Sequence, residues 1–226
     1  MSPRSLIVPL FVALAATTSA ARAEGPAVGV QAGTLGLGVS LTLDLTETLN
    51  VRGLINGAST DYDDDASGID YAFDLDLASY GAMLDWHVFG GGFRVSAGAF
   101  INDNEISGVG FPQPGSVVEI GDVLFDADDI DRTEASLGFD DFAPYVGIGW
   151  GNAVGPGKRF GVTFDLGVYL QGAPQASFRA FASPSAPAGA QALLDAEVAR
   201  EQAEIQNDLD DFEFYPVLSL GLSYKF

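Results

Sequence analysis

The chain has 226 residues, no cysteine, and 31 acidic against ten basic side chains, for a formal net charge of −21. Hydrophobic residues make up 47% of it, which excludes a disordered acidic chain. Past residue 30, no apolar run reaches the length of about 18 residues that a membrane-spanning helix needs. The excess of acids also disfavours nucleic-acid binding, which requires basic residues against the phosphates.

The first 23 residues have the pattern of a secretory signal peptide. A basic start at Arg4 precedes an apolar run from Leu6 to Ala16, and Ala21-Arg22-Ala23 forms a small-x-small cleavage pattern before Glu24. The alternative is an N-terminal helix of the folded domain. We expect residues 1–23 to be removed and residues 24–226 to form one domain with a net charge of −23 and no disulfides.

Most of the remaining chain has the period of two that is typical of β-strands. The alternation is strongest from Leu35 to Leu45, from Phe160 to Gln171 and from Phe212 to Phe226. It also predicts strands over residues 49–59, 69–86, 93–102 and 143–151. A bacterial single-chain membrane barrel has an even number of strands, so one strand is missing from these seven. The best candidate runs from Pro26 to Gly33 with a tight turn at Gly33-Thr34; the alternative is one long strand from Pro26 to Leu45.

Two architectures fit strands with one aliphatic face and one face of small or polar residues. In a soluble sandwich the apolar faces meet in a core, whereas in a transmembrane barrel they face lipid. Aromatic residues bracket the last strand, with Tyr224 and Phe226 at one end and Phe212, Phe214 and Tyr215 at the other. Such a bracket is typical of an aromatic girdle. We therefore predict an all-β, transmembrane, antiparallel up-and-down barrel of about eight strands, with an exported β-sandwich as the alternative.

The segment from Phe214 to Phe226 alternates apolar residues and ends in Phe. It resembles the closing strand of bacterial outer-membrane β-barrel proteins, and the chain resembles small barrels of the OmpA or OmpW kind. This resemblance implies a location in the cell outer membrane, among lipid and lipopolysaccharide. It also implies that Leu222, Tyr224 and Phe226 form the signal that the barrel-assembly machinery recognises.

The connections fall into two sets by length. Short ones at residues 46–48, 87–92 and 152–159 are predicted to face the periplasm, and long ones at residues 60–68, 103–142 and 172–211 to form extracellular loops. The last loop contains a helical stripe of Leu194, Val198, Ile205 and Leu209, which predicts a helix over residues 188–207. Because the following aspartates oppose the helix dipole, we expect the helix to end near Gln206 or to have a cation nearby.

The alternation points a set of charged side chains into the barrel, in its periplasmic half. Opposite charges would neutralise one another there, and an eight-stranded barrel is filled by side chains, so open conduction is not expected. A register slip of one residue would instead place these charges at the rim. The predicted interior set is Asp44, Arg52, Arg94, Asp165 and Lys225.

No motif predicts catalysis or a cofactor. His87 is the single histidine, in a predicted turn, and without cysteine or a second histidine a zinc site is unsupported. The segment Gly147-Ile-Gly-Trp-Gly151 lacks the third glycine of a dinucleotide fingerprint, and we interpret its glycines as small residues facing a crowded interior.

Acidic clusters in the long loops are candidates for binding calcium or magnesium, which prefer several oxygen ligands. The start of an EF-hand loop is imitated over residues 61–65, but Ala66 and Ala72 replace its glycine and glutamate. The alternative is a solvated acidic surface screened by cations. The candidate ligands are Asp61, Asp63, Asp65, Asp126 and Asp128.

The sequence thus favours a non-enzymatic integral outer-membrane barrel with an envelope structural or surface-interaction role. The alternative is an outer-membrane channel or transporter for a small or apolar solute. The oligomeric state is left open.

Overall fold

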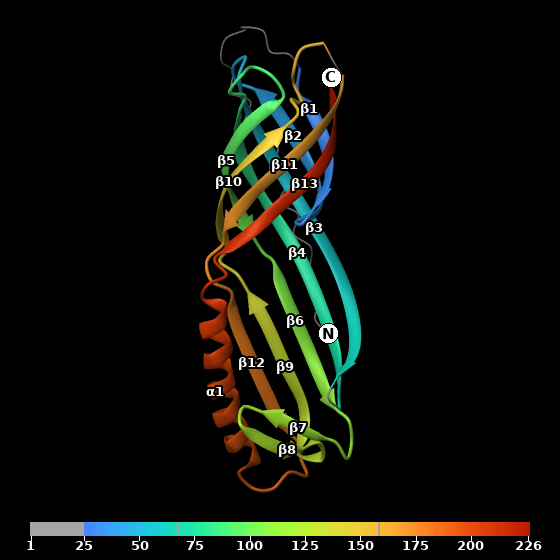
Figure 1. Cartoon of the computed structure of the whole chain (residues 1–226). Helices are drawn as coiled ribbons and strands as arrows, with labels where there is room; N and C mark the ends of the chain where they lie inside the picture. The colour runs from blue at the N-terminus through green and yellow to red at the C-terminus, as the bar shows by residue number, and fades with distance from the viewer. Residues whose placement is uncertain (1–24, 67, 158) are drawn as a thin grey trace.

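The computed structural model describes residues 25–66, 68–157 and 159–226, so the predicted signal peptide lies outside the described residues. Neighbouring strands pair antiparallel in the order β1-β2-β3-β4-β5-β10-β11-β13, and β13 pairs again with β1 (Figure 1). The predicted eight-stranded barrel is confirmed. Its strands are β1 (Ala27–Gly33), β2 (Gly36–Asp44), β3 (Leu49–Ala66), β4 (Ile69–Trp86), β5 (Phe93–Asn102), β10 (Phe142–Trp150), β11 (Phe160–Leu170) and β13 (Phe214–Lys225).

The first hairpin shows that the segment from Pro26 to Leu45 forms two strands. β1 and β2 are separated by a turn at residues 34–35, and Gly36 adopts a φ of +87°, a left-handed conformation that glycine tolerates best. The alternative of one strand from Pro26 to Leu45 is therefore wrong. The same turn tips Leu35 into the barrel, where it is buried, although the alternation placed it in the outward stripe.

Outside, the barrel wall is apolar over its whole circumference. Val30, Leu41, Val162 and Leu222 all expose more than 45% of their surface, an arrangement that lipid stabilises and water does not. Aromatic residues extend this surface near both ends. Exposed ones near the chain termini are Trp86, Phe89, Trp150, Phe160 and Phe226, and at the other end Tyr80, Phe142, Phe212 and Phe214.

Tyr215 does not belong to this outer ring, although the sequence pattern grouped it there. Its hydroxyl donates to the carbonyl oxygen of Thr34 at 2.7 Å, and its ring packs on the buried cluster inside the barrel. Its position in the alternation explains the difference, because Phe214 points outward and the next residue must point inward.

Beyond the barrel, β3 and β4 continue into a second sheet of order β12-β9-β6-β4-β3 (Figure 1). The prediction of a long loop over residues 60–68 is wrong, since these strands pair from Leu49↔Trp86 to Ala66↔Ile69. Pairing with additional strands keeps the hairpin extended. The connection 103–142 contains β6 (Glu105–Pro112), β7 (Val117–Ile120), β8 (Val123–Asp126), the 3-10 helix η1 (Ala127–Asp129) and β9 (Ile130–Gly138), and the connection 172–211 contains β12 (Gln175–Ala182) and α1 (Ala190–Leu209).

This second sheet and the elements on it form a lobe with its own core. The helix α1 and the hairpin β7–β8 lie against one sheet face, and the hairpin is tied to α1 by Arg200, which bonds Asp122 at 3.3 Å and Glu197 at 2.9 Å. The buried core comprises Ile69, Val118, Ile120, Phe125, Ala127, Ile130, Ala180, Leu194 and Val198.

The helix α1 starts and ends two residues later than predicted. Leu194 and Val198 of the predicted stripe are buried, but Ile205 is exposed, and no basic residue lies in the last turn. The expected end near Gln206 is therefore wrong. Gln206 explains the extra turn, because its Nε2 donates to the Pro174 carbonyl and to Asp210 Oδ1. Among the described residues, no helix combines the length and apolar character needed to span a bilayer.

Side chains of α1 cover the outer edge of β12. Gln206 Oε1 accepts from the Ala176 N–H at 3.1 Å and Gln202 Oε1 from the Phe178 N–H at 3.4 Å. Gln191 accepts from the Ala182 N–H at 2.7 Å and donates to the Ala180 carbonyl at 2.9 Å. An unpaired strand edge invites pairing with other chains, and these three glutamines occupy the groups that a further strand would use.

Replacing Gln206 by leucine removes its bonds to the Ala176 N–H, the Pro174 carbonyl and Asp210, and should weaken the docking of α1. With a net worth of about 1 kcal/mol per hydrogen bond, the local opening free energy should fall by about 1–2 kcal/mol. Hydrogen exchange of the segment 175–182 measures this. Leucine at the exposed neighbour Asn207 is the control, and equal exchange in the two variants would contradict the role of the edge bonds.

Candidate functional site

Four charged side chains from different strands meet inside the barrel. Arg52 comes from β3, Asp85 from β4, Arg94 from β5 and Asp165 from β11. In each strand the neighbouring residues point to lipid, so the pleat directs these four inward. Their side chains are between 2% and 7% exposed.

The two arginines each reach both carboxylates. Arg52 Nη1 and Nη2 donate to Asp165 Oδ2 and Oδ1 at 2.9 and 3.0 Å, and its Nε and Nη2 lie 2.9 and 3.0 Å from Asp85 Oδ2 and Oδ1. Arg94 Nη2 donates to Asp165 Oδ1 at 2.7 Å, and its Nε lies 3.6 Å from Asp85 Oδ1. Arg94 Nη1 also donates to the Gly151 carbonyl, and Ser96 Oγ to Asp85 Oδ1. We call Arg52, Asp85, Arg94 and Asp165 the charge cluster.

The charge cluster carries no net charge, which is what its burial requires. Desolvating an ion costs several kcal/mol, and only close partners with further hydrogen bonds offset that cost. Removing one member would leave an unpaired buried charge, which is far less favourable than the complete set. The cluster therefore holds β3, β4, β5 and β11 to one another across the interior.

Toward the lobe, an aromatic layer lies next to the charge cluster. The rings of Phe100 and Tyr169 have centroids 4.9 Å apart, and Tyr145 meets Tyr169 edge to face at 5.8 Å. Leu54 and Met83 complete this buried layer. It fills the barrel between the cluster and the lobe.

On the side of the charge cluster that faces the chain termini, His87 lies in the predicted turn, but its side chain is buried, with 1% of its surface exposed. Its Nδ1 lies 2.9 Å from the Gly91 carbonyl and its Nε2 lies 3.1 Å from Asn50 Nδ2. These partners fit a neutral ring that donates from Nδ1 and accepts at Nε2. Asn50 Nδ2 also donates to Asn152 Oδ1 at 3.2 Å, which links three elements at this end of the barrel.

The structure brings together three of the five predicted interior charges, namely Arg52, Arg94 and Asp165. Asp44 is half-buried at the end of β2, and Lys225 Nζ donates to the Gly155 carbonyl at 2.8 Å, so both lie at the rim outside the charge cluster. Asp85, which completes the charge cluster, is not among the predicted interior charges. The alternation contained the signal, because Asp85 stands between the lipid-facing Leu84 and Trp86.

Glycines make room for these layers. A Cβ at Gly149 would lie 2.8 Å from Asp165 Oδ1 and 2.9 Å from the Arg94 guanidinium carbon. Cβ atoms at Gly147 and Gly167 would come within 2.6 Å of the Tyr145 ring or its hydroxyl. The interpretation of Gly147 to Gly151 as small residues facing a crowded interior agrees with these contacts.

The predicted cation ligands lie apart from the barrel, in the lobe. Asp61, Asp63 and Asp65 follow one another along one face of β3, while Asp126 accepts from the Asp128 N–H at the start of η1. Within the described ranges, no group of three or more carboxylate, histidine or cysteine side chains is arranged to hold a metal ion. Calcium or magnesium binding stays a prediction.

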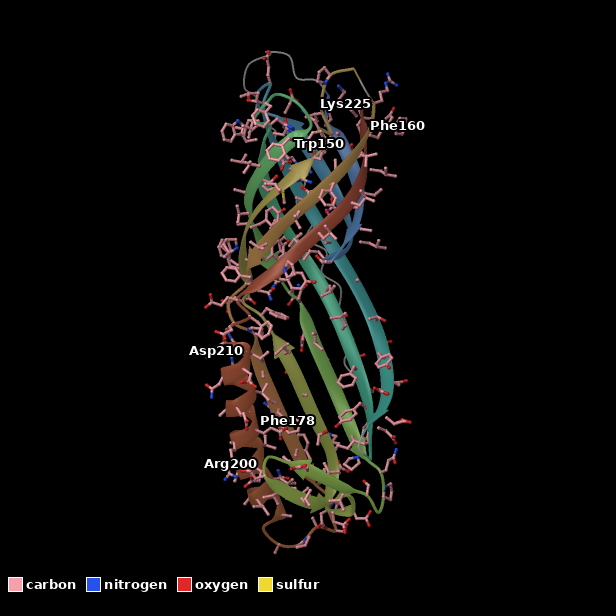
Figure 2. All side chains as sticks on the ribbon, viewed as in Figure 1. Trp150, Phe160, Phe178, Arg200, Asp210 and Lys225 are labelled. Atoms are coloured by element: carbon pink, nitrogen blue, oxygen red, sulfur yellow. The ribbon has the colours of Figure 1, made fainter. Side chains whose placement is uncertain are left out.

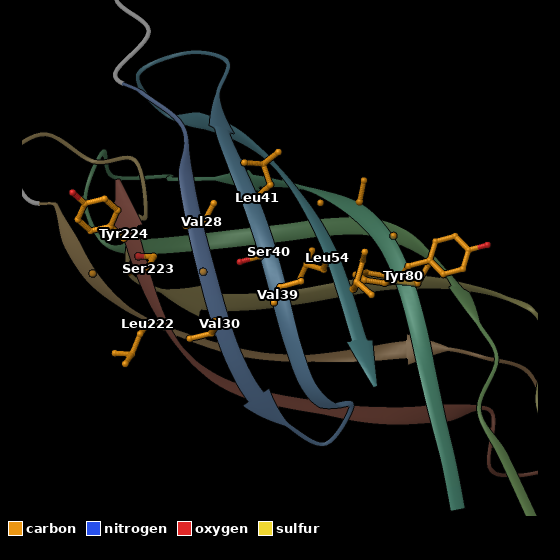
Figure 3. Close-up of a pocket in the computed structure, with 18 of the residues that line it drawn as sticks. Val28, Val30, Val39, Ser40, Leu41, Leu54, Tyr80, Leu222, Ser223 and Tyr224 are labelled. Carbon is orange, nitrogen blue, oxygen red and sulfur yellow. The ribbon is translucent and has the colours of Figure 1, made fainter. Parts of the chain in front are cut away.

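Two small hollows adjoin the charge cluster, one of about 20 Å³ on the lobe side and one of about 10 Å³ on the side of the termini. Arg52 is the lining residue that the two hollows share. A larger hollow includes the outward-pointing Val28, Val30 and Leu222 as well as Ser40 and Ser223 (Figure 3). Since it takes in both surfaces of the wall, we assign no ligand site to it.

Comparison with known proteins supports this architecture. The crystal structure of CarO2 from Acinetobacter baumannii aligns over 91% of this chain and all of that chain, with 22% identity and a TM-score of 0.59. CarO from the same organism aligns over 88% and 97%, with 22% identity and a TM-score of 0.57. The chain has the fold of an outer-membrane β-barrel.

A major outer membrane protein from Thermus thermophilus aligns over 89% of this chain and 99% of that chain at 16% identity, with a TM-score of 0.43. No protein-family model matches the sequence, and no curated protein matches it. At these identities the two CarO structures establish the barrel fold of this chain and do not establish its role.

Replacing Gly149 by alanine should destabilise the barrel, because the added Cβ collides with the charge cluster and with the Phe164 carbonyl. Overpacking of this kind costs about 1–3 kcal/mol. Urea unfolding of refolded protein, followed by tryptophan fluorescence, measures the loss. Gly53 is the matched control, since the nearest atom to its added Cβ is 4.0 Å away. Similar losses at the two positions would contradict the proposed crowding.

Burial, reinforced by the charges of Arg94 and Arg52, lowers the pKa of His87 below its ordinary value of 6.5. Below about pH 6.5, His87 therefore binds a proton more readily in the unfolded chain than in the folded barrel. The free energy of unfolding should decrease as the pH falls through this range. The free energy of unfolding should drop more between pH 7.5 and 5.5 in the wild type than in His87→Gln, which shares every carboxylate. Parallel pH profiles would overturn this assignment.

Proposed function

We propose that the protein is an integral, non-enzymatic barrel of the bacterial outer membrane, with its lobe outside the cell and an envelope structural or surface-interaction role. The observation that carries this proposal is the division of the molecule into two parts, which Figure 2 shows. The barrel is filled by the charge cluster and the aromatic layer, and the lobe has a hydrophobic core of its own. The filled interior favours a supporting role for the barrel, and the lobe offers a polar surface for interactions outside the membrane.

The orientation rests on the connections. Both described chain ends and the short turns at residues 45–48, 87–92 and 151–157 lie at one end of the barrel, which is the periplasmic arrangement in outer-membrane barrels (Figure 1). The lobe then projects outward from the opposite rim, among the headgroups and sugars of lipopolysaccharide. We further propose that β13, with Leu222, Tyr224 and Phe226 on its outer face, is the strand that the barrel-assembly machinery recognises.

The absence of an enzymatic role is part of the same proposal. His87 has both ring nitrogens engaged by Gly91 and Asn50, which leaves neither free to act as a general base. The carboxylates of Asp85 and Asp165 are paired with arginines. These groups serve stability in this arrangement.

A channel for a small solute is the second candidate function. The observation in its favour is the pair of small hollows that adjoin the charge cluster, one of them lined by Ser40, Thr42 and Ser223.

Trypsin tests the location and the orientation together. The lobe carries Arg132, Arg179 and Arg200, whereas Arg159 lies at the opposite end of the barrel. On intact cells that express the full chain, trypsin should cut at the lobe sites only, and after the outer membrane is opened it should also cut after Arg159. The intact protein should fractionate with outer membranes and change its gel mobility on boiling. Recovery as a soluble periplasmic protein, or cleavage after Arg159 alone in intact cells, would overturn the proposal.

A further inference from the structure

The sheet of the lobe has two edges, and only one of them is covered. At β12 the glutamines of α1 occupy the backbone groups. At the other edge, β2 pairs with β3 as far as Gly57, and among the described strands only β4 pairs with β3 beyond that residue (Figure 1). Residues 58–64 of β3, which we call the free edge, are all exposed. At about 3.4 Å per residue the free edge is about 24 Å long, enough for a further strand to pair with it.

Hydrogen bonds of β4 show which backbone groups of the free edge are unpaired. The Ala78 N–H donates to Asn104 Oδ1 at 2.9 Å, and the Ala78 carbonyl accepts from the Asp103 N–H at 2.8 Å. Neither group is therefore directed at Gly57, the register partner of Ala78 on β3. Hydrogen-bonded and non-bonded pairs alternate along an antiparallel ladder, so every second residue of the free edge turns its N–H and C=O away from β4. These residues are Ser59, Asp61 and Asp63.

The free edge lacks the common structural protections against strand addition. Its register with β4 runs without a bulge, and it contains neither proline nor lysine. Bulges, prolines and lysines are the features that usually protect an edge strand. Its charged side chains are all aspartates. Charges of one sign repel an acidic strand and attract a basic one, so they select a partner rather than exclude every partner.

The two sheet faces beside the free edge differ in chemistry. On one face Tyr62 lies opposite Phe73 of β4, with 62% and 37% of their surfaces exposed, and the Phe73 ring stacks on Tyr71 with centroids 5.5 Å apart. On the other face aspartates lie directly opposite one another, an arrangement that destabilises a sheet. Within the described residues none of these aspartates forms a salt bridge. They are Asp61, Asp63 and Asp65 on β3 and Asp70, Asp74 and Asp76 on β4.

A strand that pairs with the free edge would set alternate side chains beside these two faces. Basic side chains on one face would neutralise Asp61 and Asp63, and apolar or aromatic side chains on the other would cover the Tyr62 ring. A second copy of this chain does not fit, because pairing of two free edges would bring aspartates of both copies together. The acidic lobe also raises the local concentration of basic partners.

We propose that the free edge of β3 binds an extended basic segment of another polypeptide by strand addition, with lysine or arginine alternating with apolar residues. The outward N–H and C=O groups of Ser59, Asp61 and Asp63 supply the backbone bonds, and the two faces select the side chains. This inference names the partner class for the proposed surface role and rests on that role, because the lobe must lie outside the cell for such a segment to reach it.

Synthetic nine-residue peptides and the full mature chain, folded in detergent micelles, test the backbone pairing. The probe alternates lysine with valine or tyrosine. One control has the same composition with its lysines in a single block, and another is the probe with N-methyl groups on its backbone amides. The probe should bind at least about tenfold more tightly than either control. In hydrogen exchange, the amides of Ser59, Asp61 and Asp63 should become protected when the probe is added, and those of β12 should not change.

A proline variant separates strand addition from attraction between charges. Ser59→Pro removes an unpaired donor and obstructs an incoming strand while every charge is kept, so probe binding should weaken at least about tenfold. The matched control is Ser185→Pro, in the exposed connection between β12 and α1. Its affinity for the probe should equal that of the wild type.

A charge variant tests the choice of a basic partner. Asp61→Asn combined with Asp63→Asn keeps the backbone of the free edge but removes two charges, and it should weaken probe binding about tenfold. Asp208→Asn combined with Asp211→Asn removes the same charge at the far edge of the lobe and should leave binding unchanged. A gel-mobility shift on boiling verifies that each variant is folded.

The peptide comparison decides the inference even where a variant fails to fold. Absence of saturable probe binding, or equal affinity for the probe and both control peptides, would overturn strand addition. Unchanged binding in folded Ser59→Pro would do the same, since the acidic surface would then attract the peptide by charge alone. Failure of the chain to fractionate with outer membranes would instead overturn the proposed function, and peptide binding in micelles does not depend on that result.

Discussion

The absence of water inside a bilayer is the constraint on which this structure depends. Every backbone N–H and C=O in the spanning region needs a partner within the protein, and for strands this requires a closed ring. The pairing of β13 with β1 closes it. Eight strands enclose an interior only as wide as side chains can fill, so the residues that point inward must be neutral as a group and must match one another in size. The charge cluster and the glycines beside it satisfy both demands.

The same backbone rule acts differently once the strands leave the membrane. In the lobe, β3 and β4 continue as members of an open sheet, whose edges water can reach. One edge, β12, is covered by glutamines of α1, which supply amide donors and acceptors in place of another strand. The sheet face on the other side carries aspartates of β3 and β4. Partial desolvation, a hydrogen bond with Asp61 and repulsion by nearby carboxylates raise the pKa of Asp74 there.

The interior of the barrel is packed in layers of different chemistry. Arg94 is anchored by the Gly151 carbonyl and packed against Gly149, and Arg52 bonds both Asp85 and Asp165. The aromatic layer of Phe100, Tyr145 and Tyr169 fills the lobe side of this charge cluster. Glycines on the inner wall let these large side chains approach the backbone.

The barrel can be predicted from the sequence alone, because lipid on one side and a crowded interior on the other impose a period of two, which is clear from Leu37 to Leu43 and from Leu218 to Leu222. The same parity directs Arg52, Arg94 and Asp165 inward. The folded chain shows in addition that Asp85 completes the charge cluster while Asp44 and Lys225 lie at the rim. Parity gives the direction of a side chain and not its depth or its partners. Most of the lobe is predicted as loops for a related reason, because β6, β9 and β12 pair with segments far away in the chain, and a local pattern does not reveal those partners.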